Sequence, residues 1–351
     1  MIDTKIIEID PQNIEENKLR IAAEVLKTGG TVAFPTETVY GLGANALDEK
    51  ALRKIFEAKG RPSDNPLIVH IAHIEDLDQL VREIPHKARL FMASFWPGPL
   101  TMVFKKSSLV PHIITAGLDT VAIRMPSHSI AKALIEMAGV PVAAPSANLS
   151  GRPSPTQASH VIEDMKGRVN IIISGGGCSV GLESTVLDVT EEVPVILRPG
   201  GVTLEALQEV VGEVMIDQAM DGDFGLIPKS PGMKYTHYAP KAKVMMITGD
   251  VDEITHRINQ IKRENSKKGI KVGIMATDET KDNYYDAVII SMGSREKVET
   301  IAENIFAVLR RFDDMGVDLI LVEGIETKLM GHAVMNRLMK ASGYNVIKAG
   351  R

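Results

Sequence analysis

The sequence predicts an α/β protein of two domains, in which a twisted mixed sheet with flanking helices precedes a smaller Rossmann-like α/β domain. Three observations support this prediction. The chain has 351 residues, a length typical of about two domains. Short apolar runs of strand length alternate with segments of helical spacing along most of the chain. A stretch rich in glycine and proline near residues 217–238 interrupts this alternation.

The first half begins with alternating apolar and polar residues over 1–10, which predict a strand. Residues 13–28 carry apolar side chains at helical spacing and stop at Gly29 and Gly30, so they predict a helix. In residues 120–125, alternation places Arg124 on the face opposite Val121 and Ile123. The same reasoning predicts strands at 31–34, 67–71, 100–105, 140–144, 170–173, 184–189 and 195–198, and helices at 49–59, 129–138, 156–165 and 204–211.

The interruption has no sustained period, which is typical of a linker. The aromatic, basic and hydroxyl residues around Tyr235 favour a lid over a site rather than an inert spacer. Beyond it, strands predicted at 244–247, 272–275, 287–290 and 319–322 alternate with helices at 254–263, 298–311 and 333–341. We therefore expect a first domain at 1–212, a linker or lid at 213–241 and a parallel-sheet domain at 242–351. The second domain lacks a Gly-x-Gly-x-x-Gly fingerprint after its first strand, which argues against a dinucleotide site.

Composition and charge narrow the function classes. Hydrophobic residues make up 44% of the chain and charged residues 24%, as expected for a soluble globular protein. The formal net charge of −5 argues against a protein whose main task is to grip nucleic acid. Cys178 is the single cysteine, which excludes an internal disulfide and suits a reducing compartment. No signal peptide or membrane-length apolar run is present, so we expect a cytoplasmic protein.

Cationic side chains at turns and strand ends predict a site for an anionic ligand. Lys59 and Arg61 flank Gly60, and Pro62 restricts the backbone that carries Arg61. Arg124 and Arg198 end apolar strands, where an unpaired charge is costly, so each requires an anionic partner in the protein or in a substrate.

Simpler roles also fit these positions singly. An exposed basic loop, turn and cap roles for serine and asparagine, and a hydrogen-bonded core position for His70 are the alternatives. The chain has no P-loop, no zinc-ligand spacing and no Gly-x-Ser-x-Gly elbow. The residues by themselves therefore predict an α/β protein that binds a phosphorylated or carboxylated small molecule, and no more.

A series of longer motifs runs through the chain. In the first half these are Phe34-Pro-Thr-Glu-Thr-Val-Tyr-Gly-Leu-Gly43, Lys59-Gly-Arg-Pro, Asn65-Pro-Leu-Ile-Val-His70, Trp96-Pro-Gly-Pro-Leu-Thr101, Val121-Ala-Ile-Arg-Met-Pro126, Ala144-Pro-Ser-Ala-Asn148 and Glu183-Ser-Thr-Val186. Further along they are Ser230-Pro-Gly-Met-Lys-Tyr-Thr-His-Tyr-Ala-Pro240 and Gly331-His-Ala-Val-Met-Asn-Arg-Leu338. Through these motifs the chain resembles the YrdC-like family of threonylcarbamoyl-AMP synthases, in its long form with an added C-terminal domain.

The resemblance implies a nucleotidyltransferase with a YrdC-like catalytic domain. The reaction would convert L-threonine, bicarbonate or CO2, and ATP into threonylcarbamoyl-adenylate and pyrophosphate. A separate tRNA threonylcarbamoyl transferase would then attach the group to adenosine 37 of tRNAs that read codons beginning with A. The resemblance also implies Mg²⁺ with the ATP, no metal site built from protein side chains, and direct tRNA binding that is weak or unneeded.

Carried onto this sequence, the resemblance implies two groups of site residues. Those for ATP are Lys59, Arg61, Ser63, Ala144, Asn148, Ser154, Arg198 and Tyr235. Those for L-threonine are Thr36, His70, Thr120, Arg124, Ser146 and Ser184. Arg124 would supply the fork for the threonine carboxylate. Lys59 and Arg61 are the expected catalytic residues, because phosphoryl transfer depends mainly on positioning and charge neutralisation.

Two other function classes are alternatives, of which the second lacks support in the sequence. One is a non-catalytic RNA-binding protein with a YrdC-like domain, which the acidic total charge disfavours. The other is carbamoyl transfer of the hydrogenase-maturation kind, which would need zinc-finger and acylphosphatase-like segments. A chain with one cysteine offers no zinc-finger cluster.

Overall fold

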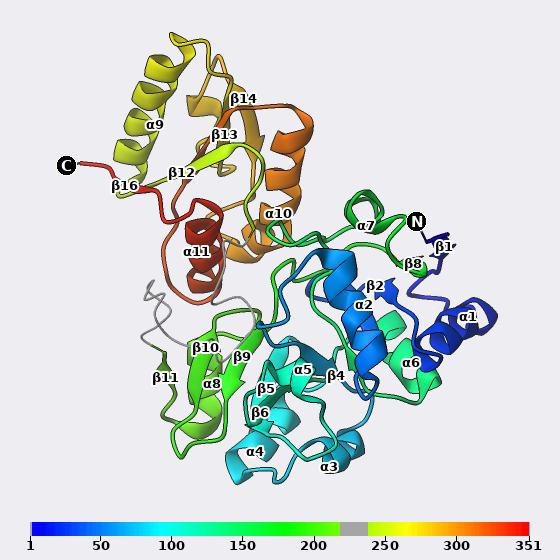
Figure 1. The fold of residues 1–351 in the computed structure, drawn as a ribbon. Helices are drawn as coiled ribbons and strands as arrows, with labels where there is room; N and C mark the ends of the chain where they lie inside the picture. Colours follow the sequence, from blue (N-terminus) through cyan, green and yellow to red (C-terminus); the bar gives the residue numbers. More distant parts are fainter. Residues whose placement is uncertain (1, 218–237, 351) are drawn as a thin grey trace. The chain divides into compact units, whose positions relative to one another are not determined.

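The structure, a computed structural model, describes residues 2–217 and 238–350. These residues form two compact units (Figure 1). The first takes the described residues up to 217 except 151–153, and the second takes 151–153 together with 238–350. Most of the linker predicted at 213–241, including Tyr235, lies outside the described residues, so the lid and the domain boundaries stay predictions.

The first unit is built on a mixed sheet in the strand order β1-β8-β2-β3-β7-β4-β6-β5-β9-β10-β11 (Figure 1). Its strands are β1 (Lys5–Glu8), β2 (Val32–Phe34), β3 (Gly41–Asn45), β4 (Ile68–His70), β5 (Leu100–Lys105), β6 (Thr120–Arg124), β7 (Val142–Ala143), β8 (Ile171–Ser174), β9 (Thr185–Asp188), β10 (Val195–Arg198) and β11 (Met215–Ile216). Its helices are α1 (Glu16–Lys27), α2 (Glu49–Lys59), α3 (Leu77–Leu80), α4 (His86–Phe95), α5 (His112–Thr115), α6 (Ser129–Ala138), α7 (Ala158–Met165) and α8 (Leu204–Val211).

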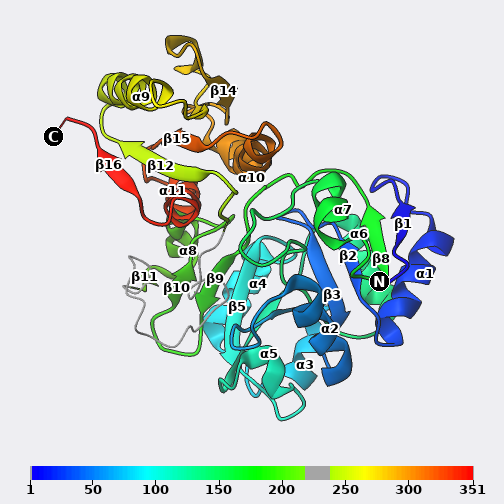
Figure 2. The ribbon, with the colours of Figure 1, turned by 45° about the horizontal axis from the view of Figure 1, so that its top comes forward.

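Helices cover the two faces of this sheet unequally. On one face, buried side chains of α1 and α6 pack on β1, β8 and β2, and these two helices lie side by side (Figure 1 and Figure 2). On the other face, α2, α4, α7 and α8 contribute to a single large core. The first face is different over β4, β6, β5, β9 and β10, where the buried cluster consists of strand residues alone: Ile68, Val103, Ala122, Val186 and Leu197. We call this the uncovered part of the sheet because no described helix contributes to its cluster, although its side chains are buried.

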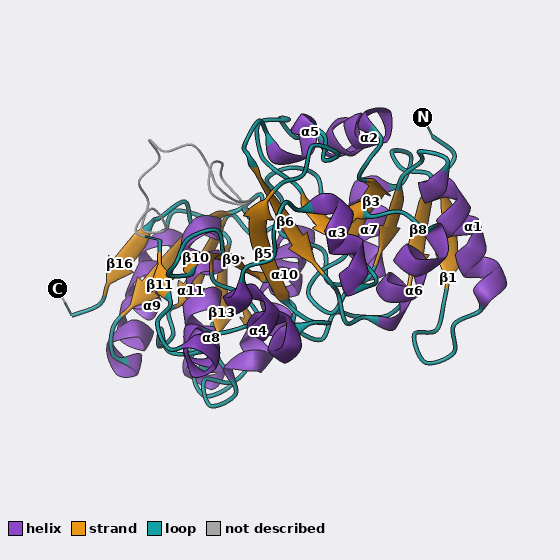
Figure 3. Ribbon diagram, turned by 90° about the horizontal axis from the view of Figure 1, so that it is seen from below, coloured by secondary structure: helices purple, strands orange, loops and turns teal. Residues whose placement is uncertain are grey.

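Local sequence explains how α2 is fixed. The Asp48 side chain accepts hydrogen bonds from the backbone amides of Lys50 (2.8 Å) and Ala51 (3.3 Å), which is a strong helix start. Gly60 ends the helix in a left-handed conformation (φ 60°), which a residue with a Cβ adopts only with strain. Helix α2 lies beside α5 (Figure 3). The chain therefore leaves α2 in a defined direction, straight into the segment that carries Arg61 and Ser63.

The second unit is a parallel five-stranded sheet in the order β14-β13-β15-β12-β16, as the Rossmann-like prediction required. Its strands are β12 (Lys243–Thr248), β13 (Val272–Ala276), β14 (Val288–Ser291), β15 (Leu319–Glu323) and β16 (Val346–Lys348). Its helices are α9 (Val251–Ser266), α10 (Val298–Asp314) and α11 (Met330–Ala341). Ile254, Ile258 and Ile261 of α9 pack on one face of the sheet.

Most predicted elements are confirmed, and α2, α6, α8, β5 and β10 have the predicted limits. Two substantial elements were not predicted. Strand β3 contains Gly41 and Gly43 and lacks β-branched residues, because Phe34 and Val142 approach so closely that a Cβ on Gly43 would lie within 2.8 Å of both. Helix α4 begins after Pro85 without a capping side chain. Among the described residues, no helix combines the length and the apolar character needed to cross a membrane.

Candidate active site

A row of polar side chains crosses the uncovered part of the first sheet. In register, His70 lies opposite Arg124, and Arg124 lies opposite Thr101. Val186 is apolar but links the row to Arg198, because it lies opposite both Thr101 and Arg198. Side chains directly opposite one another share a face, so His70, Arg124, Thr101 and Arg198 all belong to the face without a helix. Four strands that are distant in sequence thus bring these residues together.

A β-bulge aims Arg198 at this face. Ile196 pairs with Leu187, whereas Arg198 pairs with Val186, so Leu197 is the extra residue in β10. Ile196 belongs to the core under the helices, and Leu197 belongs to the cluster on the uncovered face. Strict alternation would have returned Arg198 to the helix-covered side. The bulge keeps it beside Leu197, which is a recognised use of bulges near functional sites.

Ser184 is held from three sides. Arg198 donates from Nη2 to the Ser184 carbonyl (2.9 Å) and to its hydroxyl (3.2 Å). The Ser184 hydroxyl also lies 2.7 Å from the Thr101 hydroxyl. Gly200 lies so close to this backbone that an added Cβ would be 2.4 Å from the Glu183 carbonyl oxygen, so only glycine fits there. Next to it, the buried Ser154 hydroxyl donates to Glu183 (2.5 Å).

Arg124 has its anionic partner inside the protein. Its Nη2 lies 2.6 Å from Glu37 Oε1, its Nη1 donates to the Thr38 hydroxyl (2.8 Å) and its Nε donates to the Gly98 carbonyl (3.2 Å). Both charged side chains are buried. Burial on its own would raise the pKa of Glu37, but the guanidinium of Arg124 outweighs it and holds that pKa below the usual value. The pair is therefore ionised and nearly neutral as a unit. Thr36 fixes the adjoining turn, since its hydroxyl contacts the Val39 carbonyl (2.6 Å) and the Thr38 hydroxyl (2.9 Å).

His70 is a neutral imidazole within this group. Burial, and then the positive charge of Arg124, lower the pKa of His70 to about 3. Its Nδ1 is buried and has no hydrogen-bond partner among the described residues. A buried polar atom in this condition is costly unless a ligand or a water completes it.

Lys59 organises the loop that follows β7. It is 3% exposed, and its ammonium group donates to the carbonyls of Ser146 and Asn148, the latter at 2.6 Å. The Ser146 hydroxyl in turn donates to Asn148 Oδ1 (2.5 Å). At the start of the loop, the Ala144 amide donates to the Ile68 carbonyl (2.9 Å), which ties the loop to the strand that carries His70.

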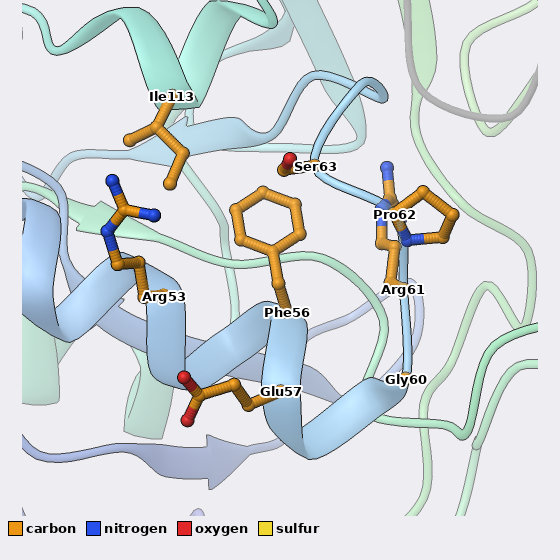
Figure 4. Close-up of a pocket in the computed structure, with 8 residues that line it drawn as sticks. All are labelled: Arg53, Phe56, Glu57, Gly60, Arg61, Pro62, Ser63 and Ile113. Atoms are coloured by element: carbon orange, nitrogen blue, oxygen red, sulfur yellow. The ribbon is translucent and has the colours of Figure 1, made fainter.

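Arg61 and Ser63 face a cavity of about 420 Å³ (Figure 4). Arg61 Nη2 donates to the carbonyls of Asn65 (3.3 Å) and Pro66 (3.1 Å), which braces the segment after α2. The other lining residues are Arg53, Phe56, Glu57, Gly60, Pro62 and Ile113.

The predicted residues thus fall into connected groups. One contains Thr36, His70, Arg124, Ser184 and Arg198, with Ser154 next to it. Another contains Lys59, Ala144, Ser146 and Asn148, and a third contains Arg61 and Ser63 at the cavity. Thr120 is apart from all of them, because it begins β6 four residues before Arg124, about 13 Å along the strand. Tyr235 lies outside the described residues. The ligand assigned to each residue stays a prediction.

Sequence reasoning did not assign Glu37, Thr38, Thr101 and Glu183, which hold the predicted residues in place. The sequence did contain a sign of the role of Glu37. An acidic residue between two threonines, directly after a buried strand, is expected to be buried and therefore to need a positively charged partner. Only the strand register, however, identifies that cation as Arg124.

Two family models match consecutive parts of the chain. The Sua5/YciO/YrdC model, described as telomere recombination, matches residues 24–200. The model described as the C-terminal domain of threonylcarbamoyl-AMP synthase matches residues 202–343.

Relatives match over nearly their full length. The threonylcarbamoyl-AMP synthase of Pyrococcus abyssi is 54% identical over 96% of this chain and 97% of its own. That of Bacillus subtilis is 48% identical over 97% of both chains. The crystal structure of P. abyssi Sua5 complexed with L-threonine superposes with a TM-score of 0.94 at 53% identity, over 98% of this chain and 99% of that one. The chain therefore belongs to the Sua5/YciO/YrdC family, in the two-domain form whose members are named threonylcarbamoyl-AMP synthases.

Proposed function

We propose that this chain is an L-threonylcarbamoyladenylate synthase, which joins L-threonine, bicarbonate or CO2, and the AMP part of ATP, and releases pyrophosphate. The observation that carries the proposal is the polar row on the uncovered face, where Arg124 and the incompletely hydrogen-bonded His70 lie side by side. The 53% identical structure of P. abyssi Sua5 with L-threonine supports threonine as the amino-acid substrate.

Threonine suits this face because each of its polar groups finds a partner there. Arg124 retains N–H groups beyond those given to Glu37, Thr38 and Gly98, and these would receive the substrate carboxylate. The Nδ1 atom of His70, neutral near pH 7, would complete its hydrogen bonding with the substrate. Ser146 and Ser184 would supply hydroxyls around the threonine side chain. Arg198, Ser154 and Asn148 would serve the nucleotide.

The chemistry needs positioning more than a strong base. The threonine nitrogen adds to CO2, which forms the N–C bond of a carbamate and releases one proton to solvent. A carbamate oxygen then attacks the α-phosphorus of ATP, a P–O bond forms, and the bond to the departing pyrophosphate breaks. Lys59 holds the loop with Ser146 and Asn148 beside the reacting groups, and Arg61 provides fixed positive charge.

Mg²⁺ is proposed to accompany the ATP. Among the residues that the structure describes, no group of three or more His, Cys, Asp or Glu side chains could hold a metal ion. Such a site is not required, because Mg²⁺ in phosphoryl-transfer enzymes is held largely by substrate phosphates and water. The residues present therefore fit an ion that arrives with its nucleotide and neutralises phosphate charge.

The direct test is mass-spectrometric detection of the product. Purified protein with ATP, Mg²⁺, bicarbonate and threonine should form threonylcarbamoyl-adenylate together with an equal amount of pyrophosphate. Serine in place of threonine should give much less. The absence of the adenylate under all these conditions would rule the proposal out.

Lys59→Ala tests two contributions of Lys59 together, its hold on the loop with Ser146 and Asn148 and its positive charge. We expect kcat/KM to fall by about 10²–10³, the typical cost of removing one preorganised electrostatic donor. The threonine Kd should change less, because Lys59 donates to the Ser146 and Asn148 carbonyls while the threonine carboxylate is assigned to Arg124. Turnover of Lys59→Ala close to wild type would argue against this role.

The product is proposed to supply a tRNA threonylcarbamoyl transferase in the cytoplasm, for position 37 of tRNAs that read codons beginning with A. Direct tRNA binding is not needed for this step. If the chain instead acted as an RNA-binding protein, its affinity for tRNA would fall steeply with salt and would not depend on threonine. A salt titration with and without threonine separates the two functions.

A further inference from the structure

Residues 151–153 belong to the second unit, although the residues on either side of them belong to the first. They lie in the loop that carries Asn148 and Ser154, both of which are assigned to the nucleotide. The first unit binds this loop near its two ends. The Ser150 amide donates to the Lys59 carbonyl (2.9 Å), and the buried Ser154 hydroxyl donates to a glutamate of the same unit (2.5 Å). The second unit binds the middle of the loop.

Arg310 of α10 makes the contact with the middle of this loop. Its Nε (3.2 Å) and its Nη2 (2.6 Å) both donate to the Pro153 carbonyl. Arg310 is 2% exposed, and burying a guanidinium is costly unless its donors are used. Two charge-assisted hydrogen bonds to one oxygen hold that oxygen more firmly than a neutral donor does. Arg310 therefore fixes the position of the Pro153 carbonyl.

The Pro153 carbonyl is directly connected to Ser154. The carbonyl carbon and oxygen of Pro153 share one peptide plane with the nitrogen and the Cα of Ser154, and this plane is rigid. Fixing the oxygen therefore restricts where the backbone of Ser154 begins. A displacement of the plane would move Ser154 with it.

The same face of α10 also contacts a second stretch of chain. Phe306 precedes Arg310 by four residues, a spacing that places both on one side of the helix. The Phe306 ring packs on Tyr238, with 5.0 Å between the ring centroids. The Ala239 amide then donates to the Gly151 carbonyl (2.9 Å). Helix α10 thus binds residues 151–153 directly through Arg310 and indirectly through Tyr238 and Ala239.

A role in stability alone is the simpler interpretation of such a contact. Glu323 illustrates that role, because its donors Tyr284 and Arg295 come from the same parallel-sheet domain. Arg310 differs, since its acceptor lies 157 residues earlier in the chain, in the loop with the assigned nucleotide residues. The contact is therefore placed to affect nucleotide binding as well as stability.

We infer that Arg310 is a positioning residue for the nucleotide, which acts through the Pro153 carbonyl on the peptide plane that leads to Ser154. The second unit thereby takes part in forming the ATP site without contacting ATP through Arg310. The inference rests on the proposed function, in which Asn148 and Ser154 serve the nucleotide. Without this contact the nucleotide itself would have to order the loop, and the cost would appear as weaker binding.

The test is a calorimetric titration of the full-length protein with Mg²⁺ and an ATP analogue whose α,β bridge cannot be cleaved. Arg310→Gln removes the charge and the double contact. Arg311→Gln is the matched control, because Arg311 is the next residue of α10 and is exposed. We expect Arg310→Gln to weaken analogue binding about tenfold, the typical cost of ordering one residue, and Arg311→Gln to change it less than twofold. The threonine Kd should stay at the wild-type value in both variants.

Tyr284→Phe controls for stability. It removes a buried hydrogen bond from Glu323 in the second unit and does not involve residues 151–153. Hydrogen exchange at the amides between 150 and 156 should become faster in Arg310→Gln and stay unchanged in Tyr284→Phe. A loss of analogue affinity in Tyr284→Phe as large as in Arg310→Gln would overturn the inference. Equal affinity in Arg310→Gln and Arg311→Gln would overturn it as well.

A conservative pair of variants keeps the test decisive if Arg310→Gln does not fold. Arg310→Lys keeps the charge but replaces two fixed donors by one flexible ammonium group. We expect a loss of analogue affinity of about threefold in Arg310→Lys and no measurable loss in Arg311→Lys. Equal affinity in these two variants would contradict the positioning role.

The two proposals can fail separately. Wild-type protein that forms no threonylcarbamoyl-adenylate, but loses affinity for the analogue in Arg310→Gln, would support the positioning role and overturn the proposed function. Threonine-dependent turnover in which the KM for ATP is the same in Arg310→Gln and Arg311→Gln would overturn the positioning role and leave the proposed function standing.

Discussion

Each of the two units buries a carboxylate beside an arginine, and the two pairs are completed differently. In the second unit, Glu323 at the end of β15 is fully buried and accepts hydrogen bonds from Thr280 (2.6 Å), Thr277 (3.0 Å), Tyr284 and Arg295 (2.8 Å). Both of its oxygens are used by the protein itself. In the first unit, Glu37 faces Arg124 at 2.6 Å, and the neighbouring His70 Nδ1 has no partner among the described residues.

The difference separates structural polar groups from binding ones. A network whose donors and acceptors are all satisfied inside the protein rigidifies the loops that it joins. A group that leaves a buried polar atom incomplete is suited to a ligand that completes it. By this criterion the Glu323 cluster stabilises the second unit, and the Glu37–Arg124 pair belongs to a binding site.

The largest expected effect on stability comes from the Glu323 network, in which both carboxylate oxygens have partners within the protein. Glu323→Ala removes the acceptor from four buried or half-buried donors, so we expect the free energy of unfolding of the second unit to fall by about 4 kcal/mol or more. Hydrogen exchange at the amides of β13 and β15 measures this free energy of unfolding. The threonine Kd should not change. Glu326→Gln, at an exposed ion pair with Lys328, is the control and should leave the stability of the second unit almost unchanged.

Glu37→Gln should destabilise the first unit by about 3 kcal/mol, because it leaves Arg124 buried without its counter-ion. In this variant, bound threonine should compensate for part of the lost stability. If Arg124 binds the threonine carboxylate, saturating threonine should stabilise Glu37→Gln more than it stabilises the wild type, as measured by urea unfolding. No such rescue is expected for Glu323→Ala. An equal effect of threonine on Glu37→Gln and on wild type would remove the distinction between the two networks.

A smaller effect concerns pH. The pKa of His70 is about 3 in the folded protein, whereas the unfolded chain has the ordinary value of 6.5. Below pH 6.5 the unfolded state therefore binds a proton that the folded state does not, and stability falls as the pH falls. The slope is about 1.4 kcal/mol per pH unit, or about 2 kcal/mol between pH 6.5 and 5. Glu37, whose pKa is lowered, loses its contribution only as the pH falls below about 4.5, outside this window.

His70→Gln should reduce this pH dependence in the first unit and leave the part that comes from His128, whose pKa burial also lowers. Urea unfolding at pH 6.5 and pH 5 gives the comparison, and hydrogen exchange in the second unit serves as the internal reference. A wild-type pH slope that persists in His70→Gln would show that another group titrates there.

The smallest effect concerns the start of α2, the helix that ends at Lys59. Asp48→Ala removes the N-cap of α2 and should cost about 1 kcal/mol, seen as a lower unfolding midpoint. An unchanged unfolding midpoint in Asp48→Ala would contradict the capping role.

Much of the fold could be read from the sequence because periodicity and turn residues agree in most elements. Gly60 marks the end of α2, and alternation in β6 correctly separates Arg124 from Val121 and Ile123. Strand β3 could not be read in this way. Its glycines serve the close approach of Phe34 and Val142, which lie elsewhere in the chain.

For the site, the sequence indicated the cations but not their partners. That Arg124 needs an anion follows from burial, whereas its pairing with Glu37 depends on how β6 and the turn after β2 meet in space. The orientation of Arg198 likewise depends on a bulge that no local pattern reveals.

The register that brings His70, Arg124, Thr101 and Arg198 into one row has a consequence for biosynthesis. Arg198 ends β10, which pairs with β9, and β9 in turn pairs with β5. A nascent chain still lacking residues 195–198 would hold most of the row but not its last cation. ATP capture by ribosome-bound chains of increasing length would therefore report when Arg198 has joined the row.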